Sequence, residues 1–152
     1  MTQIWKPHVT VAAVIERDQR FLLVEESVDR GKVFNQPAGH LEAGESILDA
    51  VIREVREETA WGFQPEALVA VQLWRKNPLA PSFLRFCFCG QVDDHDAEQM
   101  LDTDIISTHW LTLAQIQART SQLRSALVLK SIEAYLGGQR YPLSLVQTYL
   151  DL

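Results

Sequence analysis

Three glutamates close together in the chain, Glu54, Glu57 and Glu58, are the side chains best suited to metal chemistry. At positions i, i+3 and i+4 of a helix their carboxylates share one face about one turn long, where like charges repel. A divalent cation can satisfy several carboxylates at once, and oxygen ligands without Cys or His favour Mg²⁺ or Mn²⁺ over zinc. For this segment taken by itself, the alternative is a solvated acidic face that Arg53 and Arg56 neutralise.

The loop before these glutamates favours the metal site. Pro37, Gly39 and Gly44 indicate tight turns, in which the backbone can approach a ligand closely. Ser46 is expected to cap a helix, so that phosphate-binding N–H groups and cation-binding carboxylates belong to one loop–helix unit. Apolar residues recur at three- and four-residue spacing from Leu48 to Val55, which predicts a buried face of that helix.

The charged and glycine positions of this stretch resemble the signature of a known family, the Nudix box. They stand at the family's separations: Gly39, Glu45, Arg53, Glu54, Glu57 and Glu58. Fixed separations across about twenty residues make this signal much more specific than a single glycine-rich turn.

The end of the box departs from the family pattern. The family has a glycine followed by a bulky hydrophobic residue, whereas this chain has Ala60 and Trp61. We expect Ala60 to be helical and Gly62 to provide the left-handed C-terminal cap, because alanine in that conformation would cost about 1 kcal/mol.

The resemblance implies a fold, an activity and a cofactor. It implies one Nudix domain over residues 1–152 with the box at about 39–61, and the α/β class with an α/β/α sandwich and a mixed β-sheet. Four further stretches, KPHVTVA, NQPAGHLEA, FLRF and GGQRYPL, are similar to a phosphatase branch of the family. That similarity implies Mg²⁺-dependent (or Mn²⁺-dependent) release of phosphate from nucleoside tri- and diphosphates and from related compounds such as hydroxymethylpyrimidine pyrophosphate.

The same resemblance implies roles for individual residues. Glu54, Glu57 and Glu58 would hold the metal with help from the Gly39 carbonyl. Glu57 is the first candidate for the general base that takes a proton from the attacking water.

Other residues are assigned supporting roles. Asp102 and Asp104 of the acidic loop are the alternative bases. Arg53 would orient the glutamates through charge-assisted hydrogen bonds, and Glu45 would hold the loop. His40, beside the box, would either contact phosphate or be solvated.

Alternating β-rich and helical stretches independently indicate a mixed sheet between helices. The expected strands are residues 8–15, 20–26, 68–74, 83–92 and 105–111, with a polar loop at 27–32. Thr112 should cap a short helix ending near Ala118, and a second helix should run from Ser121 or Arg124 to Tyr135. Cys87 and Cys89 fall on one face of a strand and are expected to be buried free thiols.

Arg85 shares that apolar strand face and is costly to bury without an anion. Two interpretations stay open: contact with a substrate phosphate, or an internal ion pair with an acidic side chain.

Composition narrows the classes of partner. With 152 residues, 47% hydrophobic content and a net charge of −6, the chain suits one core and lacks the basic clusters of nucleic-acid binders. No apolar run is long enough for a membrane span and no signal segment is evident, so we expect a cytoplasmic protein, monomer or homodimer, acting on a small phosphorylated substrate. A nucleotide-sensing module without turnover is the alternative, although it has little need for all three glutamates. An interaction protein built on the four tryptophans is a third interpretation.

Overall fold

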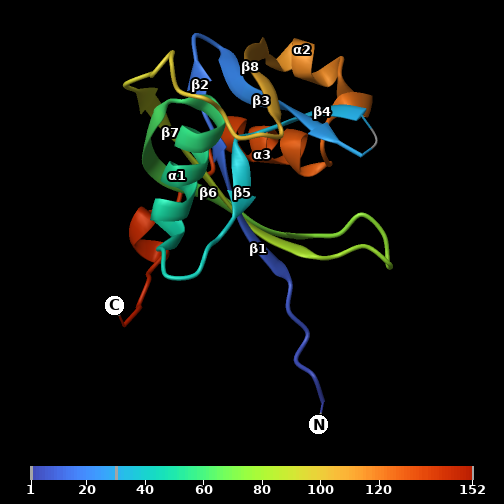
Figure 1. Ribbon diagram of the computed structural model, residues 1–152, viewed down its shortest axis with the longest axis vertical. Coiled ribbons are helices and arrows are strands. Elements are labelled where there is room, and N and C mark those ends of the chain that lie inside the picture. Colours follow the sequence, from blue (N-terminus) through green and yellow to red (C-terminus); the bar gives the residue numbers. More distant parts are fainter. Residues whose placement is uncertain (1, 30, 152) are drawn as a thin grey trace.

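The computed structural model describes residues 2–29 and 31–151, which form two four-stranded sheets with helices packed around them (Figure 1). Sheet A has the order β5-β1-β7-β6. Its strands are β5 (Ala38–His40), β1 (His8–Val14), β7 (Phe83–Asp93) and β6 (Gly62–Trp74). β1 pairs parallel with β7, whereas the β1–β5 and β6–β7 pairs are antiparallel, so the predicted mixed sheet is confirmed.

The second sheet is antiparallel and is centred on β3. It contains β2 (Glu16–Arg17), β3 (Arg20–Val28), β4 (Gly31–Asn35) and β8 (Ile105–Thr112). The turn between β2 and β3 places Asp18 and Gln19 at φ 53° and 62°, the left-handed geometry that matches the twist of a two-residue hairpin.

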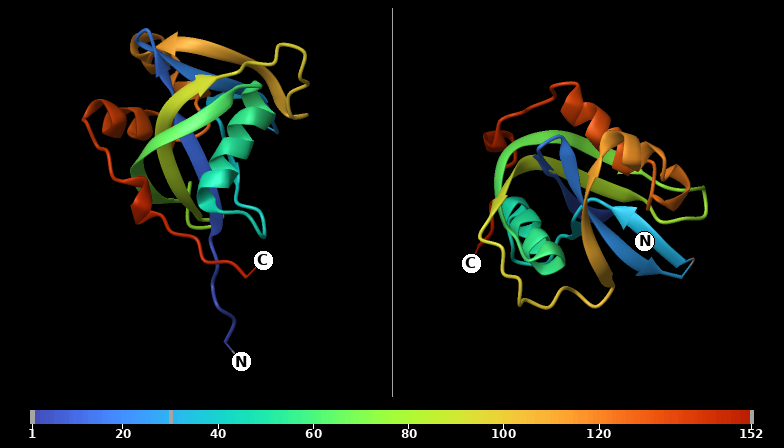
Figure 2. Two further views of the ribbon diagram at one scale, coloured as in Figure 1. Left: turned by 90° about the vertical axis from the view of Figure 1, so that its left-hand side faces the viewer. Right: turned by 90° about the horizontal axis from the view of Figure 1, so that it is seen from above.

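Helices cover both faces of sheet A (Figure 2). On one face, Val51 and Val55 of α1 (Ile47–Thr59) pack in a core that includes Phe88. On the other face, Val128 and Ile132 of α3 (Leu127–Leu136) pack in a core that includes the strand neighbours of Phe88, Cys87 and Cys89. The α/β/α arrangement follows from this alternation of side chains along β7. Both cysteines are buried and free, as expected.

Shorter helices complete the fold. They are α2 (Leu113–Gln117) and the 3₁₀ helices η1 (Thr120–Gln122) and η2 (Leu143–Leu145). Thr112 caps α2 as predicted, in a capping box with Gln115. Among the described residues, no helix combines the length and the hydropathy that a membrane span requires.

Helix α1 begins as the sequence predicts. The Ser46 hydroxyl accepts a hydrogen bond from the Asp49 N–H at 3.0 Å. In its apolar stripe Val51 and Val55 are buried, whereas Leu48 and Ile52 are partly buried. Two of the glutamates are buried as well, Glu54 at 8% exposure and Glu58 at 7%.

The expected end of α1 is wrong. Ala60, and not Gly62, takes the left-handed conformation, with φ 63° and ψ 15°. Contacts hold it there: its N–H donates to the Arg56 carbonyl at 2.9 Å, and its own carbonyl accepts from the Asp96 N–H at 3.0 Å. Gly62 instead opens β6 and pairs with Asp93. Tertiary hydrogen bonds therefore outweigh the local strain of an alanine at this position.

Three other boundaries differ from the sequence prediction, each because of pairing over a distance. The polar stretch 27–32 is mostly strand, since β3 and β4 continue pairing to Val28 and Gly31. Strand β6 starts at Gly62 because it pairs with the whole of β7. Helix α3 starts only at Leu127, because the Arg124 N–H donates to the Phe34 carbonyl at 2.8 Å and keeps that segment extended against β4.

Replacing Ala60 tests the left-handed cap. Ala60→Val should lower the free energy of unfolding by more than about 2 kcal/mol, because a β-branched side chain resists this conformation. Ala60→Gly should change it by less than about 1 kcal/mol, since relief of backbone strain offsets the lost methyl contact. Urea unfolding followed by circular dichroism measures both variants, and equal stabilities would contradict the assignment.

Candidate active site

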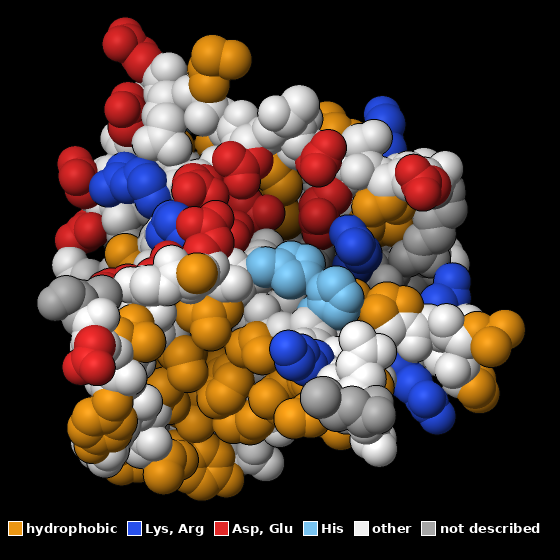
Figure 3. All heavy atoms as spheres, turned by 60° about the horizontal axis from the view of Figure 1, so that its bottom comes forward, with side chains coloured by type: hydrophobic (Ala, Val, Ile, Leu, Met, Phe, Trp, Pro, Cys, Tyr) orange, Lys and Arg blue, Asp and Glu red, His pale blue; other side chains and the backbone are white. Residues whose placement is uncertain are grey.

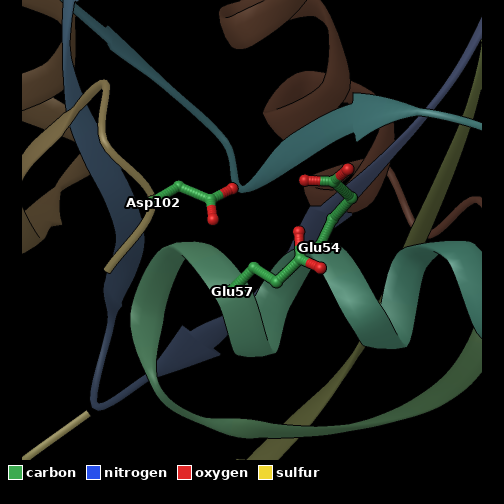
Figure 4. A group of neighbouring side chains, drawn as sticks. All are labelled: Glu54, Glu57 and Asp102. Atoms are coloured by element: carbon green, nitrogen blue, oxygen red, sulfur yellow. The ribbon is translucent and has the colours of Figure 1, made fainter. Parts of the chain in front are cut away.

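Three carboxylates from two segments of the chain converge at the end of α1 (Figure 4). One oxygen each of Glu54, Glu57 and Asp102 lies within 4.8 Å of the others. Glu54 is buried, Glu57 is partly buried and Asp102 is exposed, so the group opens from the protein interior to the surface. All of these atoms are carboxylate oxygens, the donor type that Mg²⁺ and Mn²⁺ prefer.

Asp102 reaches this group because its loop, residues 94–104, is fastened to the last turn of α1. The Asp102 N–H donates to the Glu57 carbonyl at 3.0 Å, and the Gln99 side-chain amide donates to the Arg56 carbonyl at 2.7 Å. The Arg56 guanidinium in turn donates to the Asp94 carbonyl at 2.9 Å. The loop thus supplies a donor to the Glu57 carbonyl near the helix end, and a second donor to the Arg56 carbonyl, which also accepts the Ala60 N–H.

Arg53 links the carboxylates to the loop before α1. Its Nε and Nη2 donate to the two carboxylate oxygens of Glu45 at 2.9 and 2.8 Å, a two-point contact that only a guanidinium makes. Its Nη1 donates to Glu54 at 2.8 Å and to Glu57 at 3.1 Å. Its Nη2 also donates to the His40 carbonyl at 3.0 Å. The Arg53 guanidinium therefore fixes both the loop before α1 and two of the clustered carboxylates.

The carboxylates experience different environments. The Arg53 contact lowers the pKa of Glu45. Burial raises the pKa of Glu54, and Arg53 opposes that effect. Burial raises the pKa of Glu58 to about 9, although its Oε1 accepts the Ala38 N–H at 2.8 Å. Glu58 thus holds β5 against α1 and stands apart from the group of three.

Gly39 leaves the space that the carboxylate of Glu54 occupies. A Cβ added at this glycine would collide with the Glu54 carboxyl group. The absence of a side chain at Gly39, together with the all-oxygen donor set, makes the site fit a divalent cation.

Arg85 is buried at 5% exposure, and its partners are neutral. The guanidinium donates to the Ser131 hydroxyl and the Gln36 side-chain carbonyl, both at 2.9 Å, and to Asn35 at 3.3 Å. Among the described residues, Arg85 takes part in none of the ion pairs, so the internal ion pair that the sequence left open is wrong. Contact with a substrate anion stays a prediction.

A cavity of about 590 Å³ adjoins the carboxylates at β5. Several charged or polar residues line it, among them Glu26, Gly39, His40, Arg85, Asp104 and Arg124. Its volume suits a small-molecule ligand. Figure 3 shows acidic side chains gathered beside histidine side chains on one face of the molecule.

The predicted site residues therefore divide between two places. Four of them meet at the carboxylate group: Glu54, Glu57, Arg53 and Glu45. Three others line the cavity: His40, Arg85 and Asp104. Gly39 belongs to both.

The sequence interpretation missed much of the cavity wall, including Glu26, Trp74 and Arg124. These residues come from β3, β6 and the segment before α3. No regular spacing connects them, because the strand order of the sheets brings them together.

Comparisons with known proteins agree with this geometry. Residues 6–131 match the NUDIX domain model, and the chain belongs to that family. Curated relatives named Phosphatase NudJ, from Escherichia coli (strain K12) and Shigella sonnei (strain Ss046), are 41% identical over 143 residues, 94% of this chain and 92% of each relative. A solved NUDIX hydrolase from Nitrosomonas europaea is 48% identical, with a TM-score of 0.91 over 95% of this chain and 98% of that chain.

A more distant structure, a UDP-X diphosphatase, is 20% identical with a TM-score of 0.73 over 93% of this chain and 68% of that chain, and shows the shared fold. The family resemblance inferred from the box is confirmed. The protein is a Nudix hydrolase, an enzyme that acts on pyrophosphate-containing substrates.

Adding a methyl group at Gly39 tests the fit of the carboxylates. Gly39→Ala should weaken Mn²⁺ binding at least about tenfold, because the new Cβ displaces Glu54 from Arg53 and its neighbours. Gly44→Ala is the matched control, since a Cβ there meets nothing within 4 Å and adds only backbone strain. Calorimetric Mn²⁺ titration measures the affinities, and equal affinities in the two variants would contradict this role of Gly39.

Proposed function

We propose that this protein is a metal-dependent hydrolase of nucleoside tri- and diphosphates and related pyrophosphates, in which water attacks phosphorus and phosphate is released. The observation that carries the proposal is the convergence of Glu54, Glu57 and Asp102 beside a cavity that contains the buried, cationic Arg85. An oxygen-lined cation site next to an anion-binding cavity matches the two needs of a phosphoanhydride substrate.

Mg²⁺, or Mn²⁺ in its place, would be held by Glu54, Glu57 and Asp102. Glu58 is proposed as a further ligand through the carboxylate oxygen that Ala38 does not occupy, and the Gly39 carbonyl as another. When bound, the cation neutralises charge on the diphosphate and lowers the pKa of water.

The side chains of the protein supply the remaining parts of the reaction. Glu57, the most solvent-accessible of the three glutamates, accepts the proton of the attacking water; Asp104, at the cavity, is the alternative base. Arg53 keeps Glu54 and Glu57 in place, so that little reorganisation is needed during the reaction. His40 and Arg85 bind the anionic part of the substrate.

The choice of substrates rests on similarity. The curated relatives carry the name phosphatase, which agrees with release of inorganic phosphate. The resemblance of the sequence to the phosphatase branch adds hydroxymethylpyrimidine pyrophosphate to the nucleotides as a candidate. The protein is proposed to act in the cytoplasm, as a monomer or homodimer.

Removal of the metal tests the proposal directly. Phosphate release from a panel of nucleotides and pyrophosphates should require Mg²⁺ or Mn²⁺ and should fall to the uncatalysed rate with chelator, because one guanidinium, that of Arg53, cannot neutralise three clustered carboxylates. A colorimetric phosphate assay with and without chelator measures this. An unchanged rate would refute the metal's role, and metal-dependent nucleotide binding without turnover would favour a sensing module.

Two glutamine variants separate a metal ligand from the base. Glu58→Gln should raise the Mg²⁺ concentration needed for the half-maximal rate, because it weakens a ligand. Glu57→Gln should lower the rate at saturating Mg²⁺ by about 10²–10⁴-fold, the usual contribution of a general base. Mg²⁺ titrations of the initial rate measure both effects, with Glu66→Gln on the exposed surface of β6 as the control.

If added metal restores the full rate of Glu57→Gln while Asp104→Asn stays slow, then the base belongs to the acidic loop and Glu57 is only a ligand.

A further inference from the structure

A row of aromatic side chains crosses one end of sheet A, one from each strand. It consists of Trp74 on β6, Phe83 on β7, His8 on β1 and His40 on β5, and we call it the aromatic row. Ring centroids lie 6.3 Å apart for Trp74 and Phe83, 5.1 Å for Phe83 and His8, and 5.2 Å for His8 and His40. The two histidines are also joined by a 3.0 Å hydrogen bond between ring nitrogens.

Strand pairing places the row on the same side of the sheet as Arg85. Trp74 is the cross-strand partner of Phe83, and Phe83 and Arg85 are two residues apart on β7, so all three project to one face. Trp74, Phe83 and His40 all line the cavity of about 590 Å³. The cavity floor therefore combines an aromatic surface with a buried cation.

The two ends of the aromatic row lie next to different parts of the site. Its inner end, His40, is the neighbour of Gly39, which lies against Glu54 of the carboxylate group. Its outer end, Trp74, is half-buried at the end of the edge strand β6, and Lys76, two residues beyond that strand, also lines the cavity. A ligand whose phosphates reach the carboxylates at β5 would extend its remaining part along the row toward Trp74.

We propose that the aromatic row binds a planar heterocyclic ring attached to the pyrophosphate, and that Trp74 is the residue that selects ring-bearing substrates. This inference rests on the proposed function and deepens it by naming the surface that binds the ring of the substrate and the residue that selects it. Rings stack on aromatic faces in a way that tolerates different bases, because every base has a π-face. Several nucleoside diphosphates and pyrimidine pyrophosphates therefore fit the same surface, whereas inorganic pyrophosphate gains nothing from it.

The test compares a ring-bearing and a ring-free ligand that the enzyme cannot hydrolyse. The probes are the α,β-methylene analogue of CDP and methylenediphosphonate, each titrated calorimetrically in the presence of Mg²⁺. The variants are Trp74→Ala, Trp74→Phe and, as the matched control, Leu73→Ala, the exposed neighbour on the opposite face of β6.

Trp74→Ala should weaken binding of the CDP analogue about tenfold or more, the usual effect of removing a stacking partner, and leave methylenediphosphonate unchanged. Trp74→Phe should restore most of the affinity, and Leu73→Ala should bind both probes as the wild type does. Loss of affinity for both probes alike would show a merely structural role, and unchanged affinity for both would exclude stacking. Either result overturns the proposal, as does a wild type that binds the CDP analogue no more tightly than methylenediphosphonate.

These measurements do not depend on turnover. Selective ring binding combined with failure to release phosphate from any substrate would refute the proposed hydrolysis and leave the ring site standing.

Discussion

Repulsion among the carboxylates around α1 is the constraint on which the rest of the site depends. Glu54 and Glu57 lie near Asp102, and in the described structure Arg53 is the cation that contacts both glutamates. The guanidinium holds them by sharing its donors among Glu45, Glu54 and Glu57, so the geometry of the loop and the geometry of the carboxylates are set together. Burial of Glu54 adds to this constraint, because it raises the pKa of a carboxyl group that metal binding needs ionised.

The backbone conformation at the end of α1 determines which loop residues reach the site. With Ala60 left-handed, the chain turns sharply, and the acidic loop packs on the last turn through the Asp96, Gln99 and Asp102 hydrogen bonds. The left-handed, strained backbone at Ala60 therefore helps to place Asp102, the one carboxylate of the group of three that does not come from the helix.

Strand β5 joins the two halves of the proposed reaction. It is an edge strand of sheet A, with Gly39 against the Glu54 carboxylate and His40 at the cavity. Because residue 39 has no side chain, the proposed substrate would place its phosphates at the carboxylates on one side of β5 and its ring over the sheet on the other. On the side of this edge strand that faces α1, Glu58 accepts the Ala38 N–H at 2.8 Å, which satisfies one of the backbone donors at the edge.

Local sequence determined the features that depend on near neighbours. The start of α1 at Ser46, its buried stripe, the alternation along β7 and the spacing of the box residues are all set within a few positions of the chain, and the structure agrees with them. The family and its fold could be predicted for the same reason, because the box is one continuous loop–helix unit.

Only the tertiary structure decided the features that need distant partners. Ala60 is left-handed because residues 94–102 bond to the end of α1, Arg85 meets neutral groups because β4 and α3 pack over it, and Trp74 joins Phe83 because β6 pairs with β7. The conformational propensity of a residue amounts to a free energy of about 1 kcal/mol, and the free energy of a few hydrogen bonds from elsewhere in the chain exceeds it. That is the physical reason why the sequence predicted the carboxylates and their helix, and named Asp102 of the acidic loop as a candidate, but did not predict the hydrogen bonds that place this loop or the cavity beside it.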